Sequence, residues 1–276
     1  MSILSLEFLL LAACMVLLYY LLPLRIRWAV LLAASAVYVG LSGWYSAAHL
    51  TAVVLVMWGG GLLLERKRSG LLLALLVGLD MSAMLLLKYA PFAQGLLVPV
   101  GLSYFTFQSA GYLVDVYRGK AQAQKNPLRA WLFVGYFPQL AQGPISTWKE
   151  LGPQLMTGHR LNPEQFGSGF TLLLWGYFKK LVIADRLAAT TDTLLGGGSL
   201  PGWFVLGGVM LYTVRLYMDF SGGVDVVRGL SRMVGIELPE NFHRPFFATS
   251  VADYWRRWHI TLGKWFRAYL LYPLTT

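Results

Sequence analysis

The stretch "LEFLLLAACMVLLYYLLPL", residues 6–24, is apolar at nearly every position and comes close to the length that crosses a lipid bilayer. Three similar stretches follow it, at residues 28–44, 50–64 and 70–87. About 20 apolar residues in a helix span the ~30 Å of hydrocarbon in a bilayer. Because the backbone inside lipid must satisfy its own hydrogen bonds, we expect each stretch to form a membrane-spanning helix.

The composition of the whole chain points to the same class. Its 276 residues are 57% hydrophobic and only 13% charged, whereas a soluble domain carries about 25% charged residues. Further apolar stretches occur at residues 169–183 and 204–220, and no linker or repeat divides the sequence. The sequence therefore predicts an all-α, polytopic integral membrane protein in which residues 1–276 form a single membrane domain with about eight spans.

The basic residues predict how the chain is oriented. Lys and Arg cluster near residues 25–27, 66–68 and 118–129, while residues 41–49 contain none. Such clusters face the cytoplasm, which places the N-terminus outside a multi-pass protein of the plasma or inner membrane. Lys179 and Lys180, with Asp185 and Arg186, are interpreted as interfacial anchors that also form local ion pairs at the cytoplasmic end of a span. The net charge of +10 thus indicates a membrane lipid partner, and we expect no nucleic acid partner.

Other roles for the first stretch and for the cysteine are excluded. Glu7 stands where a signal peptide would carry cations, so residues 6–24 are interpreted as the first span. Cys14 is the single cysteine, which excludes an intrachain disulfide or a cysteine-based metal site. No pair of histidines has metal-ligand spacing. We expect no metal and no tightly bound cofactor.

The middle of the chain combines apolar residues with helix breakers. The stretch "WLFVGYFPQLAQGPI", residues 131–145, is interrupted by Pro138 and Pro144, and residues 98–117 contain Pro99 together with several polar side chains. Breakers and polar groups at membrane depth are tolerated where they are buried in protein or line a cavity. We therefore expect broken or re-entrant helices around an internal space, with ordinary packing by small residues as the alternative.

Two acidic residues lie in an apolar stretch. Asp219 and Asp225 flank Ser221 in "LYMDFSGGVDVV", residues 216–227. Carboxylates within a membrane are costly and are functional candidates by default. The alternative interpretation is a structural salt bridge to Arg215 or Arg228.

A basic, aromatic segment, "SVADYWRRWHITLGKWFRAYLLYPL", occupies residues 250–274. Ser250 with Asp253 three residues on predicts a helix start, and Pro273 predicts its end. At 100° per residue, one face collects Trp255, Trp258, Leu262, Trp265, Phe266 and Tyr269, and the other Arg256, Arg257, Lys264 and Arg267. This pattern predicts one amphipathic helix in the membrane interface.

His259 lies at the edge of the predicted aromatic face, between Trp255 and Phe266 and nearer to Arg256. A neutral imidazole at such a boundary can act as a base near neutral pH. The alternative is a structural histidine whose hydrogen bonds are satisfied.

Several motifs resemble the membrane-bound O-acyltransferase family, and most closely its bacterial polysaccharide O-acetylases. They are "VPVGLSYFTFQSAGYLVDVYRGK", "FPQLAQGPI", "GYFKKLVIADRL", "LYMDFSGGVDVVRGLSRMVGIELPENFHRPF" and "DYWRRWHITLGKWFRAYLLYPL". The teichoic acid D-alanyl transferases of the same family are a second match. The resemblance covers nearly the whole chain in the family's order and implies many helices around a tunnel.

The resemblance also implies a reaction and candidate site residues. Family members move an acyl group from a thioester donor, such as acetyl-CoA or an acyl carrier, to a hydroxyl, here of a cell-surface polysaccharide. His259 matches a family histidine and is the candidate catalytic residue. The candidate substrate-binding residues are Trp255, Arg256, Arg257, Trp258, Asn241, Asp219, Ser221 and Asp225. The implied partners are a donor or carrier protein on the cytoplasmic side and an extracytoplasmic transferase.

One departure from the family keeps other functions open. Members usually continue into further spans that carry a second histidine, in a "GLWHG"-like stretch, assigned as the catalytic base. Up to Thr276 this sequence has one tryptophan–histidine pair, in "WHITL". We therefore expect the N-terminal part of such an enzyme or a shortened form, and activity by itself stays open. The alternatives are D-alanyl transfer to teichoic acid, a non-catalytic membrane scaffold, and a transporter of the acyl donor.

Overall fold

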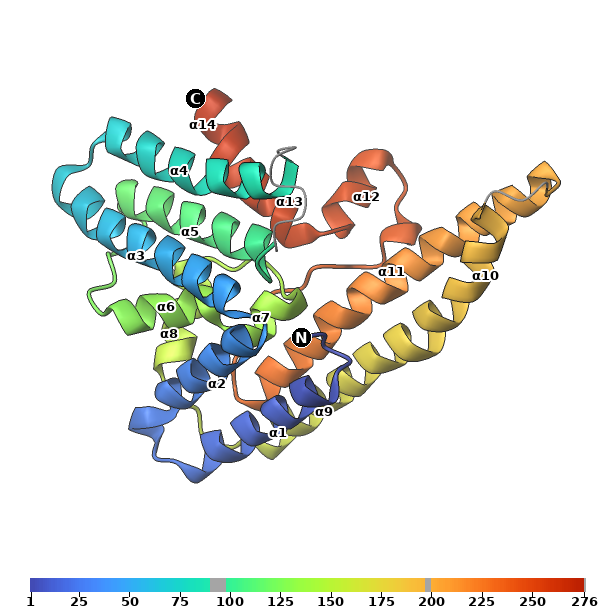
Figure 1. Ribbon diagram of the computed structural model, residues 1–276, viewed down its shortest axis with the longest axis horizontal. Helices are drawn as coiled ribbons and strands as arrows, with labels where there is room; N and C mark the ends of the chain where they lie inside the picture. The colour runs from blue at the N-terminus through green and yellow to red at the C-terminus, as the bar shows by residue number, and fades with distance from the viewer. Residues whose placement is uncertain (90–97, 197–199, 276) are drawn as a thin grey trace.

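The structure is a computed structural model that describes residues 1–89, 98–196 and 200–275, apart from the side chain of Leu274 (Figure 1). Within these residues helices form the fold, no strand occurs, and an isolated antiparallel β-bridge joins Phe242 to Trp258. The predicted all-α class is confirmed.

The first four helices follow the four apolar stretches of the sequence. They are α1 (Leu6–Leu21), α2 (Arg27–Leu41), α3 (Trp44–Lys67) and α4 (Gly70–Tyr89). In the described part of the chain, three segments are long and apolar enough to cross a membrane: Leu24–Leu41, α3 and α4. α1 is apolar but has only 16 residues. These helices agree with the predicted integral membrane protein.

The helix α5 (Leu102–Tyr117) packs against α3 and α4 and has 11 of its 16 residues buried. The predicted break in residues 131–145 is confirmed. α6 (Pro127–Gly135) ends before α7 (Phe137–Gln142), with Pro138 in the first turn of α7. Residues 143–147 are not helical, and α8 (Trp148–Met156) follows them. The non-helical segment therefore lies where the proline and glycine of "GPI" predict it.

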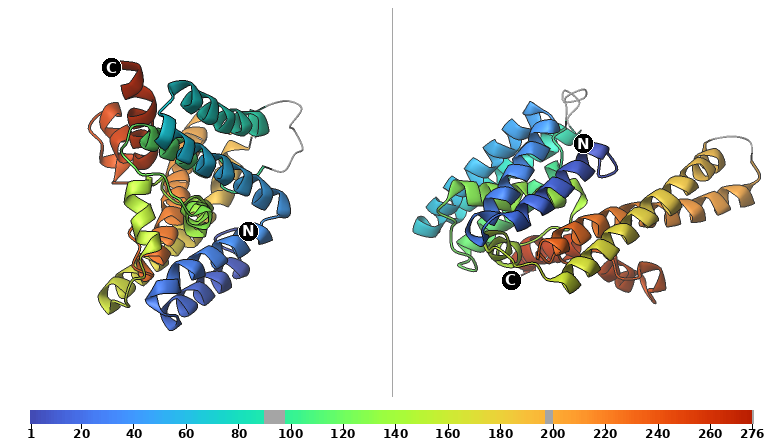
Figure 2. Two further views of the ribbon diagram at one scale, coloured as in Figure 1. Left: turned by 90° about the vertical axis from the view of Figure 1, so that its left-hand side faces the viewer. Right: turned by 90° about the horizontal axis from the view of Figure 1, so that it is seen from below.

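A long two-layered arm extends away from the other helices (Figure 2). One layer consists of α9 (Pro163–Tyr177), a π-helical segment (Phe178–Ala184) and α10 (Asp185–Leu195), and the other is α11 (Gly202–Met233). Glycines bring α9 and α11 together. A Cβ added to Gly176 would lie 2.5 Å from the Gly222 carbonyl oxygen, and one added to Gly229 would lie 2.6 Å from that of Gly169. Small residues permit this backbone contact between apolar helices.

The C-terminal segment is broken into short helices: α12 (Val251–Arg257), α13 (Ile260–Phe266), a π-helical segment (Arg267–Leu271) and α14 (Tyr272–Thr275). Its predicted start is confirmed, because the Asp253 N–H donates to Ser250 Oγ at 3.1 Å. The predicted single amphipathic helix is wrong. Trp258 leaves the helix to form the β-bridge with Phe242, and His259 has a left-handed backbone (φ 46°, ψ 53°). Side chains before and after His259 therefore do not share one helical face.

Candidate functional site

Three segments that lie far apart in the sequence are joined by hydrogen bonds at Thr261. Its N–H and its hydroxyl both donate to Asn241 Oδ1, at 3.1 and 2.9 Å. The Thr261 hydroxyl oxygen accepts from the Ile145 N–H at 3.1 Å, and the Ile260 N–H donates to the Asn241 carbonyl oxygen at 2.9 Å. Asn241 is fully buried. These bonds fix the "GPI" loop, the Asn241 loop and the turn at His259 relative to one another.

The His259 side chain sits against two aromatic rings. Its ring centroid lies 5.1 Å from that of Phe220, edge to face, and 6.4 Å from that of Phe242. Its Nδ1 is buried and has no hydrogen-bond partner among the residues that the structure describes. Burial lowers the pKa of His259 below its ordinary value, because a charged imidazolium loses its hydration there. The imidazole is therefore neutral near pH 7, and its buried Nδ1 has no partner among the described residues.

The motif residues before His259 differ in their surroundings. Trp258 stacks on Tyr254 and packs edge to face on Phe242. Trp255, in contrast, is 61% exposed. The predicted position of His259 beside Arg256 and between Trp255 and Phe266 is wrong, because it required a continuous helix. The aromatic shell of His259 comes instead from α11 and from the Asn241 loop.

Neither Arg256 nor Arg257 forms a hydrogen bond with His259. The exposed Arg256 donates to the Ala252 carbonyl oxygen at 3.3 Å, within α12. Arg257 forms an ion pair with Asp253 at 2.9 Å. Hence the lowered pKa of the imidazole has burial as its main cause.

The acidic residues of α11 pair with lysines. Asp225 accepts from Lys179 Nζ at 2.5 Å and lies 3.5 Å from Arg228 Nη1, and Asp219 pairs with Lys180. Lys179 Nζ also donates to Ser221 Oγ at 3.1 Å. The structural salt bridge to Arg228 is confirmed.

Of the two arginines considered as partners, Arg228 contacts Asp225, whereas Arg215 pairs with Asp192 at 2.7 Å. One sequence interpretation of these charges is wrong. Lys179 and Lys180 are not exposed interfacial anchors, since both are buried, at 6% and 9% exposure. They lie in the π-helical segment, where the wider turn directs two consecutive side chains towards α11.

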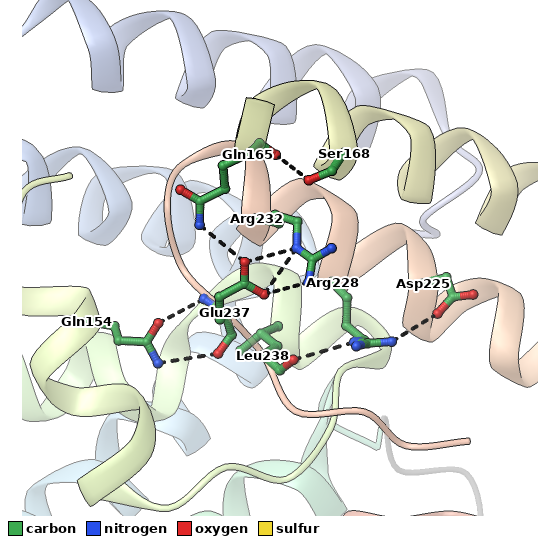
Figure 3. Close-up of polar contacts among 8 residues, drawn as sticks. All are labelled: Gln154, Gln165, Ser168, Asp225, Arg228, Arg232, Glu237 and Leu238. Carbon is green, nitrogen blue, oxygen red and sulfur yellow. Dashed lines mark hydrogen bonds and ion pairs between the residues drawn. The ribbon is translucent and has the colours of Figure 1, made fainter. Parts of the chain in front are cut away.

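A second set of polar contacts holds the loop that leads to Asn241 (Figure 3). Arg232 makes a bidentate ion pair with Glu237, in which Nε donates to Oε1 and Nη2 donates to Oε2, each at 2.9 Å. The Gln154 side chain accepts from the Glu237 N–H at 2.8 Å, and Arg228 Nε donates to the Leu238 carbonyl oxygen at 3.4 Å. Because Arg228 also touches Asp225, the buried charges of α11 are connected to the loop that positions Asn241.

Thr261 also lines a pocket of about 120 Å³. This pocket lies between α5, the "GPI" loop and α13. The residues that line it include Phe107, Gln108, Ser146, Thr261, Lys264 and Trp265. Thr261 therefore belongs both to the pocket wall and to the junction with Asn241 that holds the turn at His259.

Buried polar atoms without partners gather around this junction. Within the described residues they include Gln139 Oε1, Ser146 Oγ, Asn241 Nδ2 and His259 Nδ1. Buried polar groups normally have a protein or water partner, so such a group of atoms suits a hydrated or ligand-binding site. No three His, Cys, Asp or Glu side chains in the described ranges gather closely enough to hold a metal ion.

Several residues of this site were not singled out in the sequence. Phe220 and Phe242 each adjoin a candidate residue, Asp219 and Asn241, and could have been suspected for that reason. Thr261 and Ser146 carry no such signal, because their importance depends on the contact between distant loops.

Comparisons with known proteins agree with the motifs, although no model of a known protein family matches the chain. The chain is 40% identical over 183 residues to the probable alginate O-acetylase AlgI of Pseudomonas aeruginosa, which covers 65% of this chain and 34% of that protein. It is 33% identical over 288 residues to the probable alginate O-acetylase AlgI of Azotobacter vinelandii, which covers 93% and 56%. It is also 27% identical over 176 residues to the teichoic acid D-alanyltransferase of Bacillus subtilis, which covers 62% and 44%.

Fold and site together define a helical membrane protein with a shielded histidine beside an internal pocket. Its relatives place the chain in the membrane-bound O-acyltransferase family, as its motifs predict. In these alignments the chain spans between about a third and just over half of each relative's length.

Proposed function

We propose that the chain is part of a membrane O-acyltransferase that moves an acetyl group from a thioester donor to hydroxyls of a cell-surface polysaccharide. The observation that carries the proposal is the neutral, shielded imidazole of His259 with its unpartnered Nδ1. The names of its relatives, alginate O-acetylases, support the acetyl group and the polysaccharide acceptor.

The geometry supports general-base chemistry at His259. Its Nδ1 accepts the proton of an acceptor hydroxyl while the hydroxyl oxygen attacks the thioester carbonyl. The carbon–sulfur bond then breaks, and the leaving thiolate takes up the proton. General-base assistance contributes about 10²–10⁴-fold to such a reaction. The aromatic shell of Phe220 and Phe242 excludes water that would otherwise hydrolyse the donor.

The other candidate residues take three kinds of role in this proposal. Asn241 positions His259 through Thr261, and Trp258 closes the aromatic shell. Asp219, Ser221 and Asp225 are engaged with the buried lysines and would act on the substrate only through the loop that they support. The exposed side chains of Trp255 and Arg256 remain available to lipid or to the donor.

The remaining predictions belong to the same proposal. The protein crosses the plasma or inner membrane about eight times with its N-terminus outside, which the cation clusters support. Its donor is acetyl-CoA or an acyl carrier protein on the cytoplasmic side, and an extracytoplasmic transferase is a further partner. Membrane lipid surrounds the exposed apolar helices.

D-alanyl transfer to teichoic acid is a second candidate because a teichoic acid D-alanyltransferase is also similar to the chain. The identity of 27% to that protein, against 40% to an alginate O-acetylase, favours acetyl transfer. A non-catalytic scaffold and a donor transporter are further alternatives, in which donor binds or crosses the membrane without transfer.

The test measures transfer of labelled acetyl from a thioester to a polysaccharide by membranes that contain the chain within the longer enzyme of which it is proposed to be part. We expect His259→Ala to lower the rate at least about 100-fold. His243→Ala is the matched control, because His243 is exposed and its Nδ1 lies 3.5 Å from the Glu240 carboxylate, away from the His259 site. Equal rates for the two variants would remove His259 from the reaction, and donor movement without any transfer would favour the transporter.

A further inference from the structure

The pocket beside Thr261 combines an apolar wall with buried polar groups. Phe107 and Trp265 pack on each other with centroids 4.7 Å apart and form one side. Gln108 and Ser146, 3% and 2% exposed, lie among its lining residues. Ser146 Oγ has no hydrogen-bond partner in the described part of the chain. A buried hydroxyl left in this state costs free energy unless a ligand or water satisfies it.

The size of the pocket limits what it can hold. An apolar cavity of about 150 Å³ is known to accept one benzene molecule, so the 120 Å³ here suits a group with somewhat fewer atoms. A short acyl group with its carbonyl and sulfur has this size, whereas a long acyl chain does not.

The walls that set this size are held firmly. Trp265 Nε1 donates to the Phe107 carbonyl oxygen at 2.8 Å, and Tyr269 donates to Asp115 at 2.8 Å. Gly111 allows the contact, since a Cβ there would lie 3.1 Å from Trp265 Nε1. The pocket therefore has a fixed apolar limit on the side of α5 and α13.

We propose that this pocket binds the short acyl end of the thioester donor, with the Ser146 hydroxyl donating to the acyl carbonyl oxygen and the Phe107–Trp265 wall excluding long acyl chains. The proposal rests on the acyl transfer proposed above and names the residues that select the donor. Thr261 lines this pocket and is hydrogen-bonded to Asn241 at the turn that carries His259, so the same junction holds the donor pocket and the residue proposed to activate the acceptor.

The test replaces Ser146 by cysteine, a nucleophile that becomes acylated when a thioester carbonyl is bound next to it. Ser146→Cys is made in a Cys14→Ser background and incubated in membranes with acetyl or octanoyl thioesters of N-acetylcysteamine. The cysteine sulfur attacks the carbonyl, the carbon–sulfur bond of the donor breaks, and the released thiol takes the cysteine's proton. Mass spectrometry measures the acylated fraction. We expect acetylation at least tenfold faster than octanoylation, and at least tenfold faster than at Ser109→Cys.

Ser109→Cys is the matched control because Ser109 is 1% exposed, as buried as Ser146, and lies in α5 next to the lining residue Gln108 but does not line the pocket. If Ser146→Cys does not fold, Lys264→Cys, which lines the pocket from α13, is measured in its place. Repeating the assay with acetyl-CoA and with a carrier-bound acetyl thioester distinguishes the two sources of the same group, and faster labelling by either supports the site. Labelling no faster than at Ser109→Cys, or equal labelling by octanoyl, would overturn the proposal. Because labelling needs no acceptor, it can fail while acetyl transfer to polysaccharide persists.

Discussion

At the scale of single residues, His259 depends on a backbone conformation that its own neighbours do not specify. Helical spacing places Trp258 and His259 inside a continuous helix. The structure ends α12 at Arg257, because Trp258 pairs with Phe242 and the Ile260 N–H is taken by the Asn241 carbonyl. Histidine tolerates the left-handed region better than most side chains. The histidine itself was therefore predictable from its motif, whereas its orientation and aromatic shell were not.

Acidification should destabilise the protein through His259. Its pKa is lowered in the folded state by burial, while the unfolded chain has the ordinary value near ~6.5. Between these two pKa values the unfolded state therefore binds more protons than the folded state. The stability that comes from the neutral His259 is complete above about pH 6.5 and is lost as the pH falls towards the folded-state pKa. We expect the thermal unfolding midpoint to fall from pH 7 to pH 5, and to fall less in His259→Asn, which keeps the left-handed turn but does not titrate. His243→Ala should fall like the unchanged protein, and an identical fall in His259→Asn would contradict the prediction.

At the scale of helices, the apolar stretches predict the ends of α2 and α4 to within three residues but miss the first six residues of α3, which begins at Trp44. Hydrophobic runs between charged connections locate the helices because they leave few other choices. The π-helical segment after α9 was not predictable in this way. The residues of "GYFKKL" are compatible with an ordinary α-helix, so the sequence gives no sign of a π-helix. In the structure the π-helical segment carries Lys179 and Lys180, which form ion pairs with α11. An ion pair between two helices depends on residues from both, so the sequence of one segment does not predict it.

The pair of Lys179 and Asp225 should behave as a buried ion pair. Their side chains are 8% and 15% exposed, and removing one partner of such a pair costs about 3–5 kcal/mol because the other charge stays buried. We expect Asp225→Leu to destabilise the protein by this amount and Lys179→Met with Asp225→Leu to recover at least about 1 kcal/mol of it. Asp192→Asn is the control, since Asp192 is 70% exposed in its pair with Arg215 and should cost less than about 1 kcal/mol. Unfolding in detergent measures all three, and a double variant less stable than Asp225→Leu would count against the pair.

The contact of α9 with α11 should tolerate no side chain at Gly229. A Cβ there would lie 2.5 Å from the Leu173 backbone nitrogen and 2.6 Å from the Gly169 oxygen, so the helices must separate, at a cost of about 1–3 kcal/mol. Gly207→Ala, in the same helix but with no atom within 4 Å of the new Cβ, should instead stabilise by about 0.4–1 kcal/mol. Thermal unfolding of both variants gives the comparison. Equal stabilities would show that the glycines do not set the helix separation.

At the scale of the whole molecule, the sequence predicts the class and the membrane but not the arrangement. The arm formed by α9, α10 and α11 extends from the remaining helices (Figure 2), and apolar side chains near its far end are exposed, with Trp203 at 68% and Met210 at 62%. Hydrophobicity cannot predict this arrangement, since lipid-facing and protein-facing residues are equally apolar. The motifs identify the family and contain the residues of the loops that meet at Thr261. They do not predict the geometry of that contact.

The orientation of the molecule can be tested at the two ends of α3. This helix runs from Trp44 to Lys67, 24 residues, or about 36 Å at 1.5 Å per residue, which is enough to put its ends on opposite sides of the bilayer. Trp44 follows a connection without cations, and Lys67 lies in the cluster of residues 66–68, so the positive-inside rule puts Trp44 outside and Lys67 in the cytoplasm. In a Cys14→Ser background, an impermeant maleimide should label Trp44→Cys in intact cells and Lys67→Cys only in inverted vesicles. The reverse pattern would place the N-terminus in the cytoplasm, and labelling of both from one side would mean that α3 does not cross the membrane.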